Sequence, residues 1–234
     1  GIVGSRDLER KGTWMAVNHE RKRFAVLTNL RVPHEQVHLE KRKRSRGKAV
    51  LEALTSEQSL AATLQTLVEQ REQFAGFNLI IGDLSGWADG KEQIWYFGNH
   101  LAPAGAFQLL QPGKVYGLSN AALGTPWAKL NLGVTLVTEL GEAAASDPEC
   151  AFQILQNQEK VPRDRLVPTG LATMEEEYQL SSIFVEAPAF EYGTRTSSVL
   201  LITAAEDNVL QYYVRPYKSP GFAKFELDTR RIIL

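Results

Sequence analysis

The strongest constraint on the fold is the order of the elements that the sequence predicts. Stretches rich in β-branched and aromatic residues, separated by Gly, Asn or Asp turns, mostly follow one another as neighbours that can form hairpins. Strand pairs followed by helix pairs predict an α+β fold with antiparallel sheets, rather than a doubly wound parallel sheet. The predicted strands span residues 14–18, 24–29, 77–84, 93–97, 114–118, 182–186, 197–204 and 209–214.

Helical periodicity marks four further segments of the chain. The segment 126–140 carries Leu130, Val134 and Val137 at spacings of four and three, which puts these three residues on one helix face. A chain of 234 residues with 44% hydrophobic content can bury one substantial core, so we expect one domain over residues 1–234. The predicted helices span 49–54, 59–74, 126–140 and 148–156, and residues 161–174 are predicted to be a loop.

The stretch Gly117-Leu118-Ser119-Asn120-Ala121 nearly matches the Gly-x-Ser-x-Gly nucleophile elbow of α/β-hydrolases. That fold needs its general-base His after the nucleophile, but all four histidines precede Ser119. An elbow also turns directly into its helix, whereas here the helix signal begins later, with Thr125 as the N-cap and Pro126 as the first helical residue. The sequence therefore argues against a serine hydrolase.

His34-Glu35-Gln36-Val37-His38 matches His-Glu-x-x-His, a pattern that places two zinc ligands on one helix face. A zinc-protease helix has a buried apolar face, which this segment lacks, and no suitable third ligand follows it. We therefore expect His34 and His38 to lie on an exposed connection without metal.

Other classes of function have weak or no support. No glycine-rich phosphate loop occurs, and 82–86 is predicted to be an ordinary turn. The net charge of −1 gives no general attraction to nucleic acid, and the basic run 41–46 is predicted to be a solvated surface segment without interleaved aromatics. No apolar run is long enough for a membrane span.

The single cysteine, Cys150, bears on both the compartment and the chemistry. It is predicted to be a small core residue on a helix, with no basic neighbour to lower the pKa of its thiol. A lone thiol cannot form an intrachain disulfide, so we expect a reducing, cytoplasmic location. Covalent c-type haem attachment is excluded because Cys-x-x-Cys-His is absent, which leaves non-covalent haem contact open.

Three polar residues stand at predicted strand ends: Asn29, Asn120 and Arg195. Each can be a turn, capping or surface residue, because Asn favours turns and Arg is usually solvated. Alternatively, the two amides could stabilise a developing oxyanion in a pocket where the guanidinium lowers the pKa of a thiol. The residue types alone leave both interpretations open.

These residues belong to a series of short motifs that runs along nearly the whole chain. The motifs are Gly4-x-x-Asp7, Gly12-Thr13-Trp14, Leu27-Thr28-Asn29, Ser45-Arg46-Gly47, Gly76-Phe77-Asn78-Leu79, Tyr116-Gly117-Leu118-Ser119-Asn120, Thr125-Pro126-Trp127 and Tyr192-Gly193-Thr194-Arg195-Thr196. The ordered set resembles the NRDE family, also called the transport and Golgi organisation protein 2 family.

The resemblance implies a fold of the N-terminal-nucleophile hydrolase type, a four-layer αββα sandwich. It also implies an N-terminal Cys exposed after Met removal and an Asn-Arg-Asp-Glu motif downstream. This sequence has neither and begins with Gly1, so we expect an N-terminally incomplete NRDE-like domain.

By the same resemblance, the function expected is that of a cysteine amidohydrolase acting on a small amide, inactive as given because the nucleophile is missing. A looser similarity to bile-salt hydrolases and penicillin V acylases places Asn29 and Asn120 as oxyanion or amino-group partners and Arg195 beside the nucleophile. No cofactor or metal is required. Family members are also linked to haem mobilisation and lipid metabolism, so the alternative is a non-catalytic haem or acyl-lipid carrier.

Overall fold

The structure is a computed structural model that describes residues 1–32, 43–101, 105–141, 143, 147–202, 209–217 and 228–233. The chain divides into two compact units, Gly1–Thr125 and Pro126–Leu234, and each is described by itself. Both units contain helices and antiparallel strands, which confirms the predicted α+β class. One domain over residues 1–234 stays a prediction.

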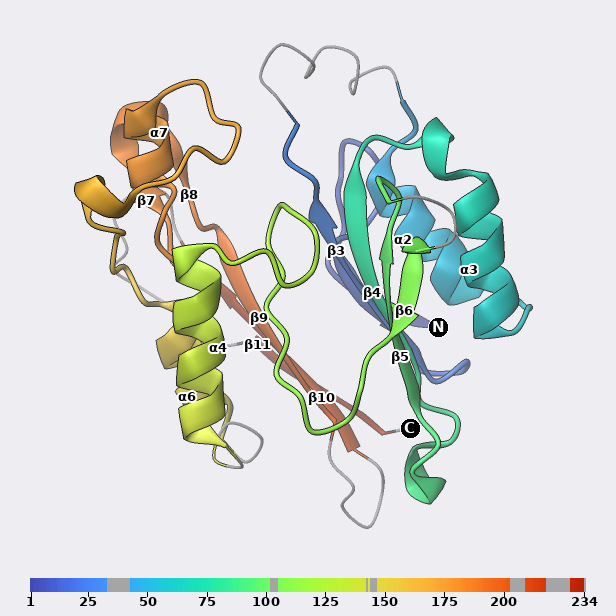
Figure 1. Cartoon of the computed structure of the whole chain (residues 1–234). Coiled ribbons are helices and arrows are strands. Elements are labelled where there is room, and N and C mark those ends of the chain that lie inside the picture. The colour runs from blue at the N-terminus through green and yellow to red at the C-terminus, as the bar shows by residue number, and fades with distance from the viewer. Residues whose placement is uncertain are drawn as a thin grey trace. The chain divides into compact units, whose positions relative to one another are not determined.

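The first unit is built on a six-stranded antiparallel sheet in which the spatial order is the sequence order (Figure 1). The register places Leu27 opposite Leu79 and Leu79 opposite Phe97, so these buried side chains share one face of the sheet. The strands are β1 (Ile2–Gly4), β2 (Met15–Asn18), β3 (Arg23–Asn29), β4 (Phe77–Asp83), β5 (Gln93–Gly98) and β6 (Phe107–Leu109).

Two helices, α2 (Arg46–Thr55) and α3 (Leu60–Glu69), connect β3 to β4 and cover that face (Figure 1). Ser59 caps α3 by accepting a hydrogen bond from the backbone N–H of Ala62 at 3.3 Å. The apolar residues of α3 recur at helical spacing and face the sheet, which gives this unit its main core. Buried members of α3 are Leu60, Leu64, Leu67 and Val68.

Two glycines explain why α2 can approach the segment before β2. A Cβ on Gly12 would lie 2.6 Å from the carbonyl carbon of Gly47, and a Cβ on Gly47 would lie 2.8 Å from the backbone nitrogen of Thr13. Both distances are below van der Waals contact, so the backbones can meet this closely only without side chains. The N–H of Thr13 donates to the Gly47 carbonyl at 3.3 Å across this contact.

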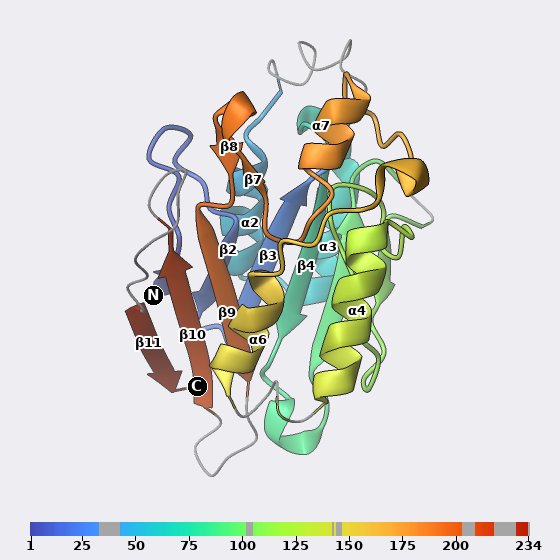
Figure 2. The same cartoon turned by 90° about the vertical axis from the view of Figure 1, so that its left-hand side faces the viewer.

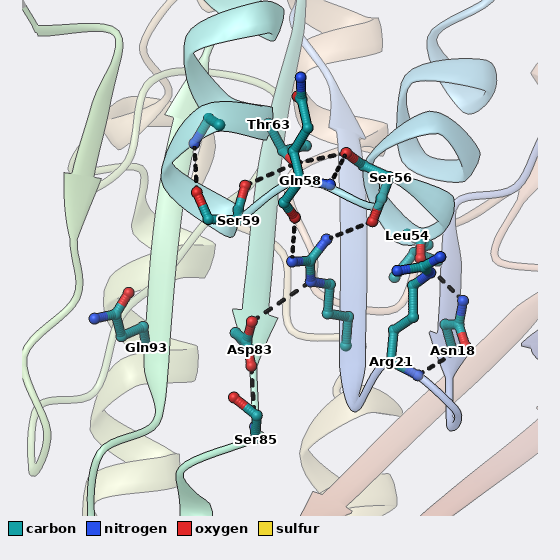
Figure 3. Close-up of polar contacts among 12 residues, drawn as sticks. Asn18, Arg21, Leu54, Ser56, Gln58, Ser59, Thr63, Asp83, Ser85 and Gln93 are labelled. Atoms are coloured by element: carbon teal, nitrogen blue, oxygen red, sulfur yellow. Dashed lines mark hydrogen bonds and ion pairs between the residues drawn. The ribbon is translucent and has the colours of Figure 1, made fainter.

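Arg23 on β3 ties the turn between α2 and α3 to the sheet. Its buried guanidinium donates to the backbone carbonyls of Ser56 at 3.1 Å and Gln58 at 2.7 Å, and its Nε lies 3.5 Å from Asp83 Oδ2. Figure 3 shows Asp83 beside Ser85, whose backbone N–H donates to the Asp83 carboxylate at 3.0 Å. The predicted turn at 82–86 is therefore confirmed, and the Asp83 carboxylate in it makes contacts that stabilise the fold.

The second unit contains a three-stranded antiparallel sheet in the order β11-β10-β9. Helix α6 (Pro148–Leu155) packs against β9, and α4 (Ala128–Leu140) packs against α6 (Figure 2). Asp147 caps α6 through the backbone N–H of Glu149 at 2.8 Å. The other elements are α7 (Met174–Gln179), the short pair β7 (Glu186–Ala187) and β8 (Tyr192–Gly193), β9 (Thr196–Ile202), β10 (Val209–Pro216) and β11 (Asp228–Ile233).

Several predicted elements are wrong or differ in extent. Residues 114–118 form no strand: the hydroxyl of Tyr116 accepts the backbone N–H of Gln111 at 2.9 Å, which closes a loop instead. Of the predicted strand 182–186, only the last residue is in β7, because the Ser182 hydroxyl bonds to the Phe184 carbonyl and bends the chain. The helix predicted over 59–74 ends at Glu69 and is followed by a short 3-10 turn.

One prediction about the core also needs correction. Cys150 is partly exposed, because it lies in the first turn of α6, 3.8 Å from the capping carboxylate of Asp147. Arg44 of the basic run is exposed, as predicted for a surface segment, and it pairs with Glu52 at 2.5 Å and lies over the Phe74 ring at 4.5 Å. Residues 41 and 42 of that run lie outside the described residues. Among the residues described, no helix has the length and apolar character needed to cross a bilayer.

Candidate functional site: the strand end at Asn29 and Asn120

Asn29 and Asn120 lie together at the end of β3. The side-chain Nδ2 of Asn120 donates to the backbone carbonyl of Asn29 at 2.9 Å. In the opposite direction, the backbone N–H of Arg31 donates to the Asn120 carbonyl at 2.6 Å. Two segments 91 residues apart in sequence are thus joined through one asparagine.

Side chains from the sheet hold the Asn120 segment in place. The Thr28 hydroxyl donates to the Ser119 carbonyl at 2.6 Å, and Asn78 Nδ2 donates to the Ala121 carbonyl at 2.9 Å. Asn78 Nδ2 is also 3.1 Å from the Thr28 hydroxyl oxygen, which lies opposite it on the neighbouring strand. Backbone carbonyls on both sides of Asn120 are therefore fixed by these two residues.

Tyr96 on β5 completes this arrangement. Its buried hydroxyl donates to Asn78 Oδ1 at 2.8 Å and accepts the backbone N–H of Leu123 at 3.3 Å. Burial raises the pKa of the Tyr96 phenol above its usual value, and the hydrogen bond from Leu123 opposes this in part. Thr28, Asn78 and Tyr96, one from each of three adjacent strands, are called the strand-end network below.

The sequence motifs include Thr28 and Asn78, but they did not predict that these residues form the strand-end network with Tyr96. The signal was available in the run Phe77-Asn78-Leu79, where a fully buried amide interrupts an apolar strand. A buried polar group must be hydrogen-bonded, so its presence predicts a partner segment on that face of the sheet. Nothing in the sequence indicates which segment that is.

The strand end offers amide groups to a ligand. The side chain of Asn29 is exposed and makes no hydrogen bond with another residue in the described part of the chain. Asn120 is half-buried: it uses one N–H on the Asn29 carbonyl, and its Oδ1 lies 3.4 Å from the Ser119 hydroxyl. Amide N–H groups in fixed positions can stabilise an oxyanion, which is the chemistry predicted for this pair.

The geometry around Ser119 agrees with the rejection of a nucleophile elbow. No strand leads into Ser119, and no helix follows it directly. The predicted start of the next helix is wrong, because α4 begins at Ala128 with Trp127 at its N-cap position. Thr125 instead donates its hydroxyl to the Ala122 carbonyl at 2.7 Å, which closes a turn before the helix.

Arg195 belongs to the second unit, between β8 and β9. Its side chain is exposed and makes no hydrogen bond or ion pair with the residues that the structure describes. The backbone around it is fixed, since Tyr217 N–H donates to the Arg195 carbonyl at 2.8 Å and Thr194 exchanges hydrogen bonds with Val185. Its approach to the two asparagines stays a prediction.

The described histidines belong to no cluster of metal ligands. No group of three His, Cys, Asp or Glu side chains within the described ranges is arranged to hold a metal ion. His34 and His38 lie outside those ranges, and His19 lies 3.0 Å from the Gly1 amino nitrogen. Burial lowers the pKa of His100, which favours a neutral imidazole at neutral pH.

Comparison with known proteins places the chain in a family. The model of the Transport and Golgi organisation 2 family matches residues 1–217. The chain belongs to this family. It is 34% identical over 204 residues to a Transport and Golgi organization protein 2 homolog of Bos taurus, covering 82% of this chain and 68% of the relative.

Two other members of the Transport and Golgi organisation 2 family match a similar length of this chain. The Homo sapiens homolog is 34% identical over 215 residues, or 87% of this chain and 73% of the relative. The Transport and Golgi organization protein 2 of Drosophila melanogaster is 27% identical over 217 residues, 86% of this chain and 72% of its own length. The NRDE-family resemblance stated from the motifs is thus confirmed.

Proposed function

We propose that this chain supplies the amide part of a cysteine amidohydrolase site of the N-terminal-nucleophile type, acting on a small amide. The observation that carries the proposal is the pairing of Asn120 with Asn29 on a segment fixed by the strand-end network. Such rigidity suits an oxyanion site, because its donors must be in position before the charge develops.

The chemistry proposed needs four kinds of group. The α-amino group of the N-terminal Cys takes the thiol proton, the thiolate attacks the amide carbonyl, and the amides of Asn29 and Asn120 stabilise the oxyanion. The C–N bond then breaks, the amine leaves with the proton from the α-amino group, and water hydrolyses the thioester. Arg195 favours the thiolate over the thiol. The nucleophile proposed is an N-terminal Cys of the kind that the family resemblance implies, and the 234 residues given do not supply it.

We also propose that the fold is the four-layer αββα sandwich that the resemblance implies. Support comes from the composition of each unit taken by itself. The first unit supplies an antiparallel sheet with α2 and α3 on one face, and the second supplies an antiparallel sheet with α6 packed on β9. Each unit therefore contains one sheet layer and one helix layer of the kind this fold requires.

The decisive experiment fuses to Gly1 a short N-terminal segment that begins with Cys after removal of the initiator Met, in a Cys150→Ser background. We expect the new thiol to react with iodoacetamide faster than a free cysteine and to be trapped as an acyl-enzyme by an activated amide or ester, seen by mass spectrometry. Asn120→Ala should reduce acylation at least tenfold, in keeping with the loss of one oxyanion donor.

The matched control is Asn131→Ala, which changes an exposed asparagine on α4 in the second unit. Acylation that is unaffected by Asn120→Ala and Asn29→Ala, while the protein melts at the same temperature, would reject the two asparagines as oxyanion partners. Replacement of the new Cys by Ser should abolish fast alkylation and shows that the label is on that residue.

A non-catalytic role in haem or acyl-lipid binding is the second candidate. It is favoured by the residues described at the strand end, which include amides and hydroxyls but no thiol. A carrier predicts stoichiometric uptake of haemin or of a long-chain acyl-CoA by the chain as given, with no dependence on an added Cys. An amidohydrolase predicts no such uptake, so calorimetric titration with both ligands separates the two candidates.

A further inference from the structure

A pocket of about 260 Å³ lies within the second unit and shares no lining residue with the strand-end network. Its volume is below the range of about 300–1,000 Å³ usual for drug-sized ligands, so it suits a smaller molecule. The six residues that line it come from the segment after α6, from α7, from the segment before β7, from β7 itself and from the 3-10 turn after it: Gln158, Lys160, Gln179, Phe184, Glu186 and Pro188.

The walls of this pocket are fixed by contacts within the same unit. The backbone N–H of Phe184 donates to the Asn157 carbonyl at 2.8 Å, and the N–H of Val161 donates to the Ser181 hydroxyl at 3.0 Å. The buried ring of Phe184 meets the Tyr217 ring edge to face, with centroids 4.9 Å apart. The pocket is therefore held by several independent contacts, which is what a preformed ligand site requires.

Lys160 brings a positive charge to the pocket. Its ammonium donates to Gln179 Oε1 and lies 5.1 Å from the centroid of the Tyr178 ring. The carboxylate of Glu175 accepts from Gln179 at 2.7 Å and pairs with Arg163 at 2.8 Å, and these contacts lower its pKa, with a smaller contribution from the charge of Lys160. No ion pair joins Lys160 to an acid in the described part of the chain.

Glu186 brings a negative charge to the same pocket. Its backbone pairs with Gly193 in the β7–β8 ladder, while its carboxylate makes no hydrogen bond or ion pair with any residue that the structure describes. Lys160 and Glu186 thus line one cavity without pairing with each other. A ligand with one negative and one positive group could contact both residues.

We propose that this pocket binds a small zwitterion of the free amino acid class. Lys160 contacts the ligand carboxylate, Glu186 contacts its ammonium group, and Phe184 with Pro188 forms an apolar surface for a short aliphatic side chain. Each charged contact is a charge-assisted hydrogen bond, stronger than one between neutral groups. The proposal uses no residue of the strand-end site and is independent of the proposed amidase.

Isothermal titration calorimetry of the full chain with three probes tests the proposal. L-valine carries both charges, N-acetyl-L-valine lacks the ammonium group, and L-valine methyl ester lacks the carboxylate. We expect L-valine to bind saturably with one site, and each derivative to bind about tenfold more weakly or not at all, since a hydrogen bond to a charged group contributes at least that factor.

Two pocket variants then assign the contacts. Glu186→Gln should lower the affinity for L-valine to that of the unmodified protein for the N-acetyl compound. Lys160→Met should lower the affinity for L-valine to that for the methyl ester. Glu191→Gln and Lys114→Met, which change exposed charges outside the pocket lining, should leave binding unchanged.

Titration of the unmodified protein is enough to reject the proposal, so the test does not depend on whether the variants fold. Absence of saturable L-valine binding would reject the pocket as an amino acid site. Equal affinity for the three probes would reject Lys160 and Glu186 as the recognition groups.

Discussion

At the scale of single residues, Asn78 is the group on which the candidate site most depends. It is fully buried, and its amide joins Tyr96 on one side to the carbonyls around Asn120 on the other. We predict that Asn78→Ala lowers the free energy of unfolding by about 2–3 kcal/mol, because several buried hydrogen bonds are lost together. Urea unfolding followed by tryptophan fluorescence measures this, since Trp14, Trp87 and Trp95 lie in the first unit.

The control for Asn78→Ala is Asn131→Ala on the exposed side of α4, with an expected change within about 0.5 kcal/mol. Hydrogen exchange adds a local measurement. The amides of Arg31 and Leu123 should exchange faster in Asn78→Ala, because both are hydrogen-bonded to the strand end. Unchanged exchange at these two amides would show that the network does not hold the Asn120 segment.

Because of Tyr96, the free energy of unfolding is expected to fall at alkaline pH. Its pKa is raised by burial from the usual 10.0, so the unfolded chain releases the phenolic proton at a lower pH than the folded one. The Tyr96 contribution to stability is therefore complete below the unfolded pKa and is lost as the pH rises through the folded pKa.

The prediction is a fall in the free energy of unfolding above about pH 10, of up to about 1.4 kcal/mol per pH unit, that is smaller in Tyr96→Phe. Urea unfolding between about pH 8 and pH 11 measures both proteins. Tyr116→Phe, which removes an exposed phenol, is the matched control. An identical alkaline slope in the original protein and in Tyr96→Phe would contradict this assignment.

At the scale of elements, one ion pair fastens α6 to the sheet of the second unit. The buried guanidinium of Arg215 on β10 donates to both carboxylate oxygens of Glu149 at 3.2 and 2.6 Å and lies over the Phe152 ring at 4.0 Å. The hydrogen bonds from Arg215 lower the pKa of Glu149. This stabilisation is present above the unfolded pKa and is lost as the pH falls through the folded pKa.

We predict that Glu149→Gln lowers the free energy of unfolding at neutral pH by about 1–2 kcal/mol, a range reduced because the Glu149 side chain is 49% exposed. The difference between the two proteins should shrink below about pH 4, where Glu149 becomes protonated. Chemical unfolding against pH checks this, with the exposed Glu159→Gln as control. A pH-independent difference would mean that packing, not charge, is lost.

The elements that the sequence predicted well are those with a clear period. The strands at 24–29, 77–84 and 93–97 and the helix at 148–156 agree with the structure within a residue or two, because each alternates or repeats over a buried face. The short strands β6 and β8 and the six-residue helix α7 were missed, since segments this short show little periodicity. Phe107–Leu109 is a strand because β5 offers it a ladder, which is tertiary information.

Of the three predicted site residues, the structure brings two together, and the place of Arg195 beside them stays a prediction. The motifs named Asn29 and Asn120, and the structure brings both to one strand end. They gave no indication that Asn120 binds the Asn29 backbone rather than facing a ligand with both N–H groups. The buried carboxylate of Glu177 was also missed, although it accepts from Thr169 and Leu171 and fixes the loop before α7.

At the scale of the whole molecule, one prediction concerns the distance between Arg195 of the second unit and the two asparagines of the first. The prediction is that the side chains of Asn29, Asn120 and Arg195 lie within about 10 Å of one another, because catalytic groups must act on the same atoms. Replacing Asn29 and Arg195 by Cys in a Cys150→Ser background should give an intramolecular link with a bismaleimide of that span. Peptide mass spectrometry identifies the link, and the same reaction in urea shows how much forms without the fold.

The chemical form of this prediction uses the protein extended by an N-terminal Cys. A cation close to a thiol lowers its pKa by about one unit or more, so Arg195→Ala should slow alkylation of the Cys about tenfold below the pKa of a free thiol. Arg195→Lys keeps the charge and should retain most of the rate, which separates electrostatics from packing. Arg165→Ala, another exposed arginine of the second unit, should leave the rate unchanged. Alkylation that is equally fast with and without the Arg195 charge, together with no cross-link to Asn29, would make Arg195 a surface residue and leave the carrier as the better proposal.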